Sequence, residues 1–213
     1  MAIEVYLDGR TTKGQANLQP RTDNQVWTEV QIAKPLNEKI DFVLLGVMRF
    51  GRNVSRPVNE RIGAGISIKA GKYLTLFPFY LHVDSQPTAI NHSSEERITL
   101  EATAKFPLLR KFVFSDRNRV EFHLHSPPPD FVQYRNRMQL EHPLGFYGLH
   151  GFLGDEVFYD SQASAWIRNR IYVGVSKEVN KHFKLELYYG RQNDSHSRPG
   201  DLNVVGTSFK FRV

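Results

Sequence analysis

The strongest constraint in this sequence is a repeated alternation of apolar and polar side chains, in segments of roughly ten residues, from position 25 to the C-terminus. In the last segment, Val205, Phe209 and Phe211 fall on one face, and Lys210 and Arg212 fall on the other. Successive side chains of a strand point to opposite sides, so this period predicts β-strands. Because the polar face is charged, we expect a β-barrel with an ionic interior and an apolar exterior.

The chain has room for one β domain. Its 213 residues contain nothing that looks like a linker. We therefore expect a single barrel domain over 1–213, with a poorly patterned first strand and polar loop over 1–24 and well-patterned strands over 25–213. Hydrophobic residues make up 40% of the chain, yet no apolar run reaches about eighteen residues, which excludes a transmembrane helix. Membrane-spanning strands escape that test, since every second residue faces away from lipid.

Charge and cysteine content limit the chemistry. The formal net charge is +6, but the Lys and Arg residues are interleaved with 22 acidic residues, and this distribution does not favour nucleic-acid binding. Without cysteine the chain has neither thiol chemistry nor a Cys-zinc site. We expect no cofactor and no metal. The expected partners are membrane lipid or detergent and small solutes, and we expect the barrel to be a monomer.

The first residues carry no export signal, because Met1 to Glu4 form neither a basic nor an apolar region. The chain is therefore either a cytoplasmic protein or a mature exported sequence to which a starting Met has been added. The strand pattern favours the second interpretation, and we expect the mature protein in a bacterial outer membrane.

The pattern predicts twelve antiparallel strands. They cover 3–8, 25–34, 40–51, 60–69, 73–84, 94–106, 117–125, 131–142, 147–160, 166–177, 182–193 and 202–213. The connections after the second, fourth, sixth, eighth and tenth strands are tight, whereas those between them are mostly longer and more polar. Short turns at one end, longer loops at the other and an even strand number are typical of outer-membrane barrels.

Charged positions keep to one face across neighbouring strands. In 117–125, Arg119, Glu121 and His123 oppose Val120 and Phe122. The predicted lumen network comprises Arg49, Arg61, Arg97, Glu101, Arg119, Glu121, His123, Arg135, Arg137, Glu141, Glu156, Arg168, Arg170 and Glu186. These residues could hold the barrel's shape through cross-strand ion pairs, or they could line a charge-selective passage. Both interpretations stay open.

Three residues break the pattern. Asn136 and Asp155 fall on the apolar face, and Pro78 lies inside a predicted strand. We expect local bulges, or strand ends outside the hydrocarbon layer, to accommodate them.

Short motifs carry a family resemblance. They are RNRMQLE from Arg135, DEVF from Asp155, RNRIYVG from Arg168 and LYYGRQ from Leu187. Over 27–213 the chain resembles a bacterial outer-membrane-type barrel family known only as a domain of unknown function, in which Trp27 would match an early-strand Trp and Arg49 a second-strand Arg. The resemblance implies export and a barrel fold but supplies no activity and no catalytic residues. Many such barrels end in an aromatic residue, whereas this chain ends in Val213.

A lipid-modifying hydrolase is one alternative. Such an enzyme needs a Ser and a His at the outer rim, oriented by an acid or an amide. The candidates are His142 or His150, with Ser161 or Ser164 and with Asp160. The serines lie in a polar loop without the glycine pattern of a nucleophile elbow, so we expect no enzymatic activity.

Two further alternatives concern ligands. His123 and His125 share a strand face with Glu121, which could form a three-ligand edge for a divalent metal, although such histidines are more often lumen or rim residues. A soluble lipocalin-like barrel would turn the apolar face inward around a ligand. We favour an all-β, single up-and-down transmembrane barrel of about twelve strands with a charged interior. It would act as a passive, narrow, porin-like channel or as a structural barrel.

Overall fold

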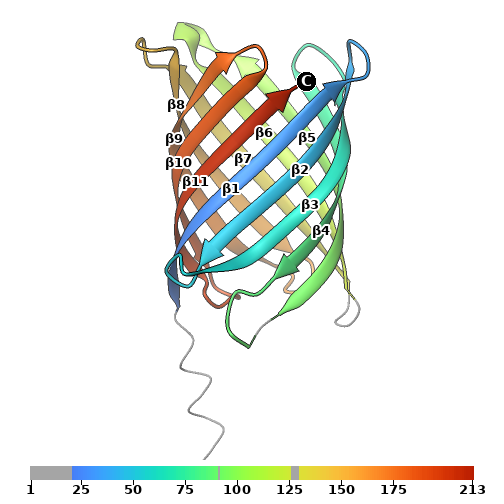
Figure 1. Ribbon diagram of the computed structural model, residues 1–213, viewed down its shortest axis with the longest axis vertical. Helices are drawn as coiled ribbons and strands as arrows, with labels where there is room; N and C mark the ends of the chain where they lie inside the picture. Colours follow the sequence, from blue (N-terminus) through green and yellow to red (C-terminus); the bar gives the residue numbers. More distant parts are fainter. Residues whose placement is uncertain (1–20, 91, 126–129) are drawn as a thin grey trace, which may run out of the picture.

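The computed structural model describes residues 21–90, 92–125 and 130–213, which form eleven strands in a closed barrel (Figure 1). The strands are β1 (Thr22–Pro35), β2 (Ile40–Gly51), β3 (Arg56–Lys69), β4 (Leu74–Ser85), β5 (Ser93–Pro107), β6 (Val113–Leu124), β7 (Phe131–Pro143), β8 (Leu149–Asp160), β9 (Ala165–Asn180), β10 (Phe183–Asp194) and β11 (Asp201–Arg212). A short 3-10 turn, η1 (Leu109–Lys111), joins β5 to β6. No helix of the described residues is long and apolar enough to cross a membrane.

The barrel closes through a parallel pair. Consecutive strands pair antiparallel, but β1 and β11 run in the same direction, with Val26 opposite Val205. The prediction of a wholly antiparallel barrel is therefore wrong at this seam, because an odd number of up-and-down strands closes only with a parallel pair. The predicted strand over 3–8 lies outside the described residues.

The connections alternate between two ends of the barrel (Figure 1). We call the end that holds 36–39, 70–73, 108–112, 144–148 and 181–182 the turn end; the C-terminus lies there. The opposite loop end holds 52–55, 86–90, 92, 125, 130, 161–164 and 195–200, and β1 begins there. The difference in length between the two sets is smaller than predicted, because strands such as β3 extend further toward the loop end than the alternation indicated.

Pro78 interrupts one ladder without shifting it. Gly65 pairs with Phe79 and Ile68 with Leu76, while the two positions between them on β3 have no partner. Proline has no backbone N–H to donate, which explains the gap. The register is the same on both sides of the gap, so no bulge is needed here.

The outer surface of the barrel is largely apolar. Large exposed side chains follow the outward positions of every strand, and they include Leu44, Ile62, Leu100, Met138, Leu153, Val173, Leu187 and Val205. The predicted charged positions alternate with them and face inward, where Glu121, Arg135 and Glu156 are buried. The two faces therefore have the predicted orientation.

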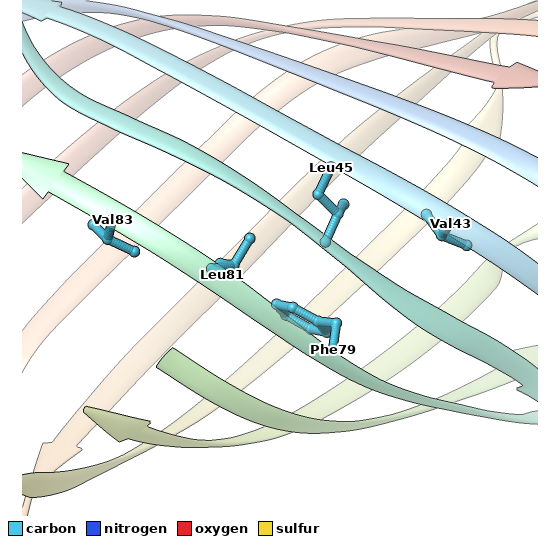
Figure 2. Close-up of a cluster of buried hydrophobic side chains, with 5 residues drawn as sticks. All are labelled: Val43, Leu45, Phe79, Leu81 and Val83. Carbon is cyan, nitrogen blue, oxygen red and sulfur yellow. The ribbon is translucent and has the colours of Figure 1, made fainter. Parts of the chain in front are cut away.

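One side of the interior is apolar, a feature that the prediction of a charged interior did not include. Val43 and Leu45 of β2 pack with Phe79, Leu81 and Val83 of β4 (Figure 2). Two strands that are not neighbours can make this contact because β3 places glycines between them, at 63 and 65. The charged residues are concentrated on β5 to β9, so the lumen wall has an apolar side and an ionic side.

Candidate functional site

The centre of the candidate site is a pair of carboxylates inside the barrel. Glu121 and Glu156 are each only 1% exposed. Arg135 lies between them and donates from Nη1 to Glu121 Oε1 at 2.6 Å and from Nη2 to Glu156 Oε1 at 2.8 Å. Glu156 also accepts hydrogen bonds from Arg117 Nη2 at 2.7 Å and from the hydroxyl of Tyr172 at 2.8 Å. One arginine of β7 thereby ties β6 to β8.

A third carboxylate extends the network toward β5. Glu101 faces Arg119 across the β5–β6 ladder and accepts hydrogen bonds from its Nε, at 2.8 Å, and from its Nη2. Arg119 Nη1 lies 3.4 Å from Glu121 Oε1, which joins this pair to the central one. Charge-assisted hydrogen bonds of this kind are stronger than neutral ones. The structure thus brings together, as one layer, the predicted residues Arg97, Glu101, Arg119, Glu121, His123, Arg135, Glu156 and Arg170.

The loop-end side of this layer is a carboxylate–histidine group. Glu95 Oε2 lies 3.0 Å from His123 Nδ1 and 2.7 Å from His125 Nε2, and Glu95 also pairs with Arg97. The alternative of a three-ligand metal edge is not formed: His123 Nε2 lies 3.4 Å from Glu121 Oε2, but His125 pairs with Glu95 instead. Within the described ranges, no group of three or more His, Asp or Glu side chains is arranged to hold a metal ion. Sequence reasoning missed Glu95, although it occupies an inward position two residues before Arg97.

Three predicted arginines have no ion-pair partner among the residues that the structure describes. Within the described part of the chain, no carboxylate lies within 4.0 Å of Arg49, Arg61 or Arg137. Arg61 and Arg137 bond to side-chain amide oxygens, and Arg49 lies over the Trp27 ring at 3.8 Å. These side chains leave uncompensated positive charge on the inner wall.

Aromatic rings fill the space between the guanidinium groups. Phe158 is 1% exposed and has the guanidinium carbons of Arg135 and Arg170 at 4.6 Å and that of Arg168 at 5.1 Å from its ring centre. Arg170 also lies 4.8 Å from the ring of Trp27, which belongs to β1. Strands β10 and β11 separate β9 from β1, so this contact reaches across part of the lumen. In the sequence, these rings could have been identified as aromatic residues that fall on the charged face of a strand.

The remaining predicted residues form separate pairs near the two ends. Glu141 pairs with His150 and Glu186 with Lys210 at the turn end, and Arg168 pairs with Asp194 at the loop end. They do not belong to the central layer.

The energetics of the central layer favour rigidity. Removing charges from water costs several kcal/mol per ion, and that cost is recovered only where partners and geometry are good. Glu121 and Glu156 each have several donors, so both carboxylates are well compensated. Their near-complete burial means that side chains fill the interior around them. The arrangement can hold neighbouring strands together, and it narrows the lumen at this height.

The predicted hydrolase residues are not brought together. His142 and His150 lie near the turn end, where they bond to Arg110 O and to Glu141 respectively. Asp160 and the serines at 161 and 164 lie at the loop end, where Asp160 accepts backbone hydrogen bonds from the turn that follows it. A barrel length separates the two groups.

The two polar exceptions on the outer face, Asn136 and Asp155, are each hydrogen-bonded to side chains of an adjacent strand. Asn136 donates to Asp116 at 2.6 Å and to Asn118 at 3.1 Å, and Asn169 donates to Asp155 at 2.5 Å. The β7–β8 pairing has no register shift at these positions. A bulge is therefore not what accommodates them; hydrogen bonds between side chains of adjacent strands do so.

Comparison with known proteins identifies one matching protein family. Residues 24–203 match the model of a family described as protein of unknown function, DUF2490. No curated protein matches the chain. The match covers most of the barrel and confirms the resemblance inferred from the motifs in 135–192. The chain therefore belongs to the DUF2490 family of proteins of unknown function.

Proposed function

We propose that this protein is a transmembrane β-barrel of a bacterial outer membrane, and that its lumen is a passive, narrow, charge-lined passage. The observation that carries the proposal is the distribution of side chains between the two faces. Outward positions carry exposed Leu, Ile, Val and Phe on every side of the barrel, while Arg and Glu lie inside. A barrel in water would expose this apolar surface to solvent, whereas a lipid bilayer would cover it.

Strand number supports a narrow passage. Eight strands give an interior that side chains fill, and sixteen or more leave an aqueous channel. Eleven described strands lie between these limits, and the central layer uses long Arg, Phe and Trp side chains to occupy the interior. We infer a constriction at the level of Glu121, Arg135 and Glu156.

The unpaired arginines support a preference for anions. Arg49, Arg61 and Arg137 face inward without a carboxylate partner in the described residues. A ring of positive side chains in a passage lowers the energy of anions and raises that of cations. Small anionic solutes are therefore the class that this passage would favour.

The membrane part of the proposal is tested by solubility. The purified chain should require detergent, give a β-rich circular dichroism spectrum, and migrate faster on a gel when it has not been heated. Monodisperse protein without detergent would overturn the proposal and would point instead to a soluble barrel.

The passage is tested by conductance in planar bilayers. Wild-type protein should give small channels, and Arg170→Ala should enlarge them, because Arg170 reaches from β9 to the ring of Trp27 on β1. Ile171→Ala, at the neighbouring outward position, is the matched control and should conduct as the wild type does.

A second candidate is a sealed structural barrel. The burial of Glu121 and Glu156 favours it, since an open passage would wet these carboxylates. Absence of conductance in both the wild type and Arg170→Ala, in protein that has inserted, would select this candidate over the passage.

A further inference from the structure

The lysines of this chain are gathered at one end of the barrel. All ten lysines among the described residues lie in turn-end connections or within four residues of a strand's turn end. They are Lys34, Lys39, Lys69, Lys72, Lys105, Lys111, Lys177, Lys181, Lys184 and Lys210. In the described part of the loop end, the basic residues of the connections and nearby strand ends are arginines, among them Arg21, Arg52, Arg56 and Arg198. Strand pairing fixes this segregation, so it does not depend on side-chain conformation.

Most of these lysines have no acidic partner in the described part of the chain. In the described ranges, only Lys184 and Lys210 form ion pairs, both with Glu186. Seven of the ten are exposed. At the loop end, by contrast, Asp201 pairs with two arginines and Asp194 with Arg168. The turn end therefore carries a surplus of positive charge, which we call the lysine ring.

Apolar surface lies directly beside the lysine ring. An open groove of about 430 Å³ is lined by Leu108, Leu109, Phe112 and Leu140. Leu109 is 89% exposed, and Tyr147, on the next turn-end connection, is 82% exposed. Lysine stems can lie along apolar surface while their ammonium groups reach a polar layer, and aromatic side chains favour the same boundary.

We propose that the lysine ring binds the headgroups of anionic glycerophospholipids in the leaflet at the turn end. The proposal rests on the proposed membrane location. The lysines come from four of the five turn-end connections or their flanking strands and from the end of β11, so they occur around most of the barrel; the connection from β7 to β8 and its two strands have none. A leaflet contacts the whole circumference, whereas an acidic protein would cover one sector. The lysines of the short turns stay close to the edge of the apolar wall, at the depth of lipid phosphates, whereas Lys184 and Lys210 face inward and pair with Glu186.

Lipid selectivity tests this proposal. Folded protein is placed in phosphatidylcholine vesicles, and electron spin resonance measures its association with spin-labelled phosphatidylglycerol relative to spin-labelled phosphatidylcholine. At low salt we expect a preference of roughly fivefold for phosphatidylglycerol. The preference should largely disappear at about 0.5 M NaCl, where charges are screened.

Two matched variants localise the effect. Combining Lys34→Gln, Lys111→Gln and Lys181→Gln removes three exposed charges at the turn end and should reduce the preference at least severalfold. Removing the same number of charges at the loop end, with Arg21→Gln, Arg56→Gln and Arg198→Gln, should leave it unchanged.

The outcomes separate the two proposals. Protein that inserts into phosphatidylcholine vesicles but associates equally with both lipids contradicts the lysine ring and leaves the membrane barrel standing. Stronger selection of spin-labelled lipid A than of phosphatidylglycerol also overturns the assignment. A chain that inserts into neither kind of vesicle contradicts both proposals.

Discussion

Trp27 and Arg49 face each other directly across β1 and β2, and the guanidinium carbon lies 3.8 Å from the centre of the indole ring. The indole N–H donates to Gln25 Oε1 at 2.7 Å, which fixes the plane of the ring. Arg170 approaches the same ring from β9. The two residues singled out by the family resemblance are thus one cation–π pair, and it holds an arginine that has no carboxylate partner in the described chain.

This pair should contribute measurably to stability. Trp27→Ala removes a ring that is only 5% exposed, and we expect the free energy of unfolding to fall by about 3–5 kcal/mol. Arg49→Met keeps most of the side-chain volume but removes the charge, and should cost about 1–2 kcal/mol. Urea titration in detergent micelles, followed by circular dichroism, measures both. Val26→Ala, an outward neighbour, is the control; an equal loss in all three variants would contradict a specific role for the pair.

The glycine at 63 should be intolerant of any side chain. A methyl group there would overlap the carbonyl oxygen of Tyr80 and the side chain of Leu81. We expect Gly63→Ala to lower the free energy of unfolding by about 3 kcal/mol, because the apolar side of the lumen is already packed. Gly46→Ala is the matched control, since a methyl group at Gly46 meets nothing within 4 Å. Equal unfolding midpoints for the two variants would contradict the contact of β2 with β4 over β3.

The alternation of side chains was sufficient to predict eleven strands and the orientation of their faces, because period two is a local property of each strand. It could not predict the apolar side of the lumen, since β2 is apolar on both faces: Leu44 is exposed, and Val43 and Leu45 are buried. Strict alternation would also place Ile167 outward; the bulge between Phe158 and Tyr159 lets it be buried instead. The alternation along the chain predicts neither contacts between strands that are distant in the sequence nor local register shifts.

The seam between β1 and β11 can be tested by cross-linking. Val26 and Val205 are register partners, and neighbouring strands place such positions within the range of a disulfide. The chain has no cysteine, so Val26→Cys with Val205→Cys gives a unique pair that should oxidise readily. Val26→Cys with Phe209→Cys, four residues out of register, should not. Failure of the first pair to cross-link in folded protein would mean that another strand separates β1 from β11.

The central carboxylates should be costly to neutralise. Glu156→Gln leaves Arg135 and Arg117 facing a neutral amide inside the barrel, and breaking a buried ion pair on one side costs about 3–5 kcal/mol. We expect the urea midpoint to fall accordingly. When samples are heated before electrophoresis, the faster-migrating folded form should disappear at a lower temperature than in the wild type. Glu60→Gln, at an exposed position, should leave both measurements unchanged. A Glu156→Gln variant as stable as the wild type would show that the layer contributes little to holding β6, β7 and β8 together.

Ion selectivity offers the sharpest test of the unpaired arginines. Combining Arg49→Gln, Arg61→Gln and Arg137→Gln removes the inward charges that have no carboxylate partner in the described chain, while the ion pairs around Glu121 and Glu156 stay in place. In bilayers with a KCl gradient, the reversal potential of the wild type should correspond to anion preference, and that of the triple variant should shift toward cation preference. Lys34→Gln, at an exposed position near the turn end, should leave the reversal potential unchanged. The same reversal potential in wild type and triple variant would mean that permeating ions do not pass these arginines.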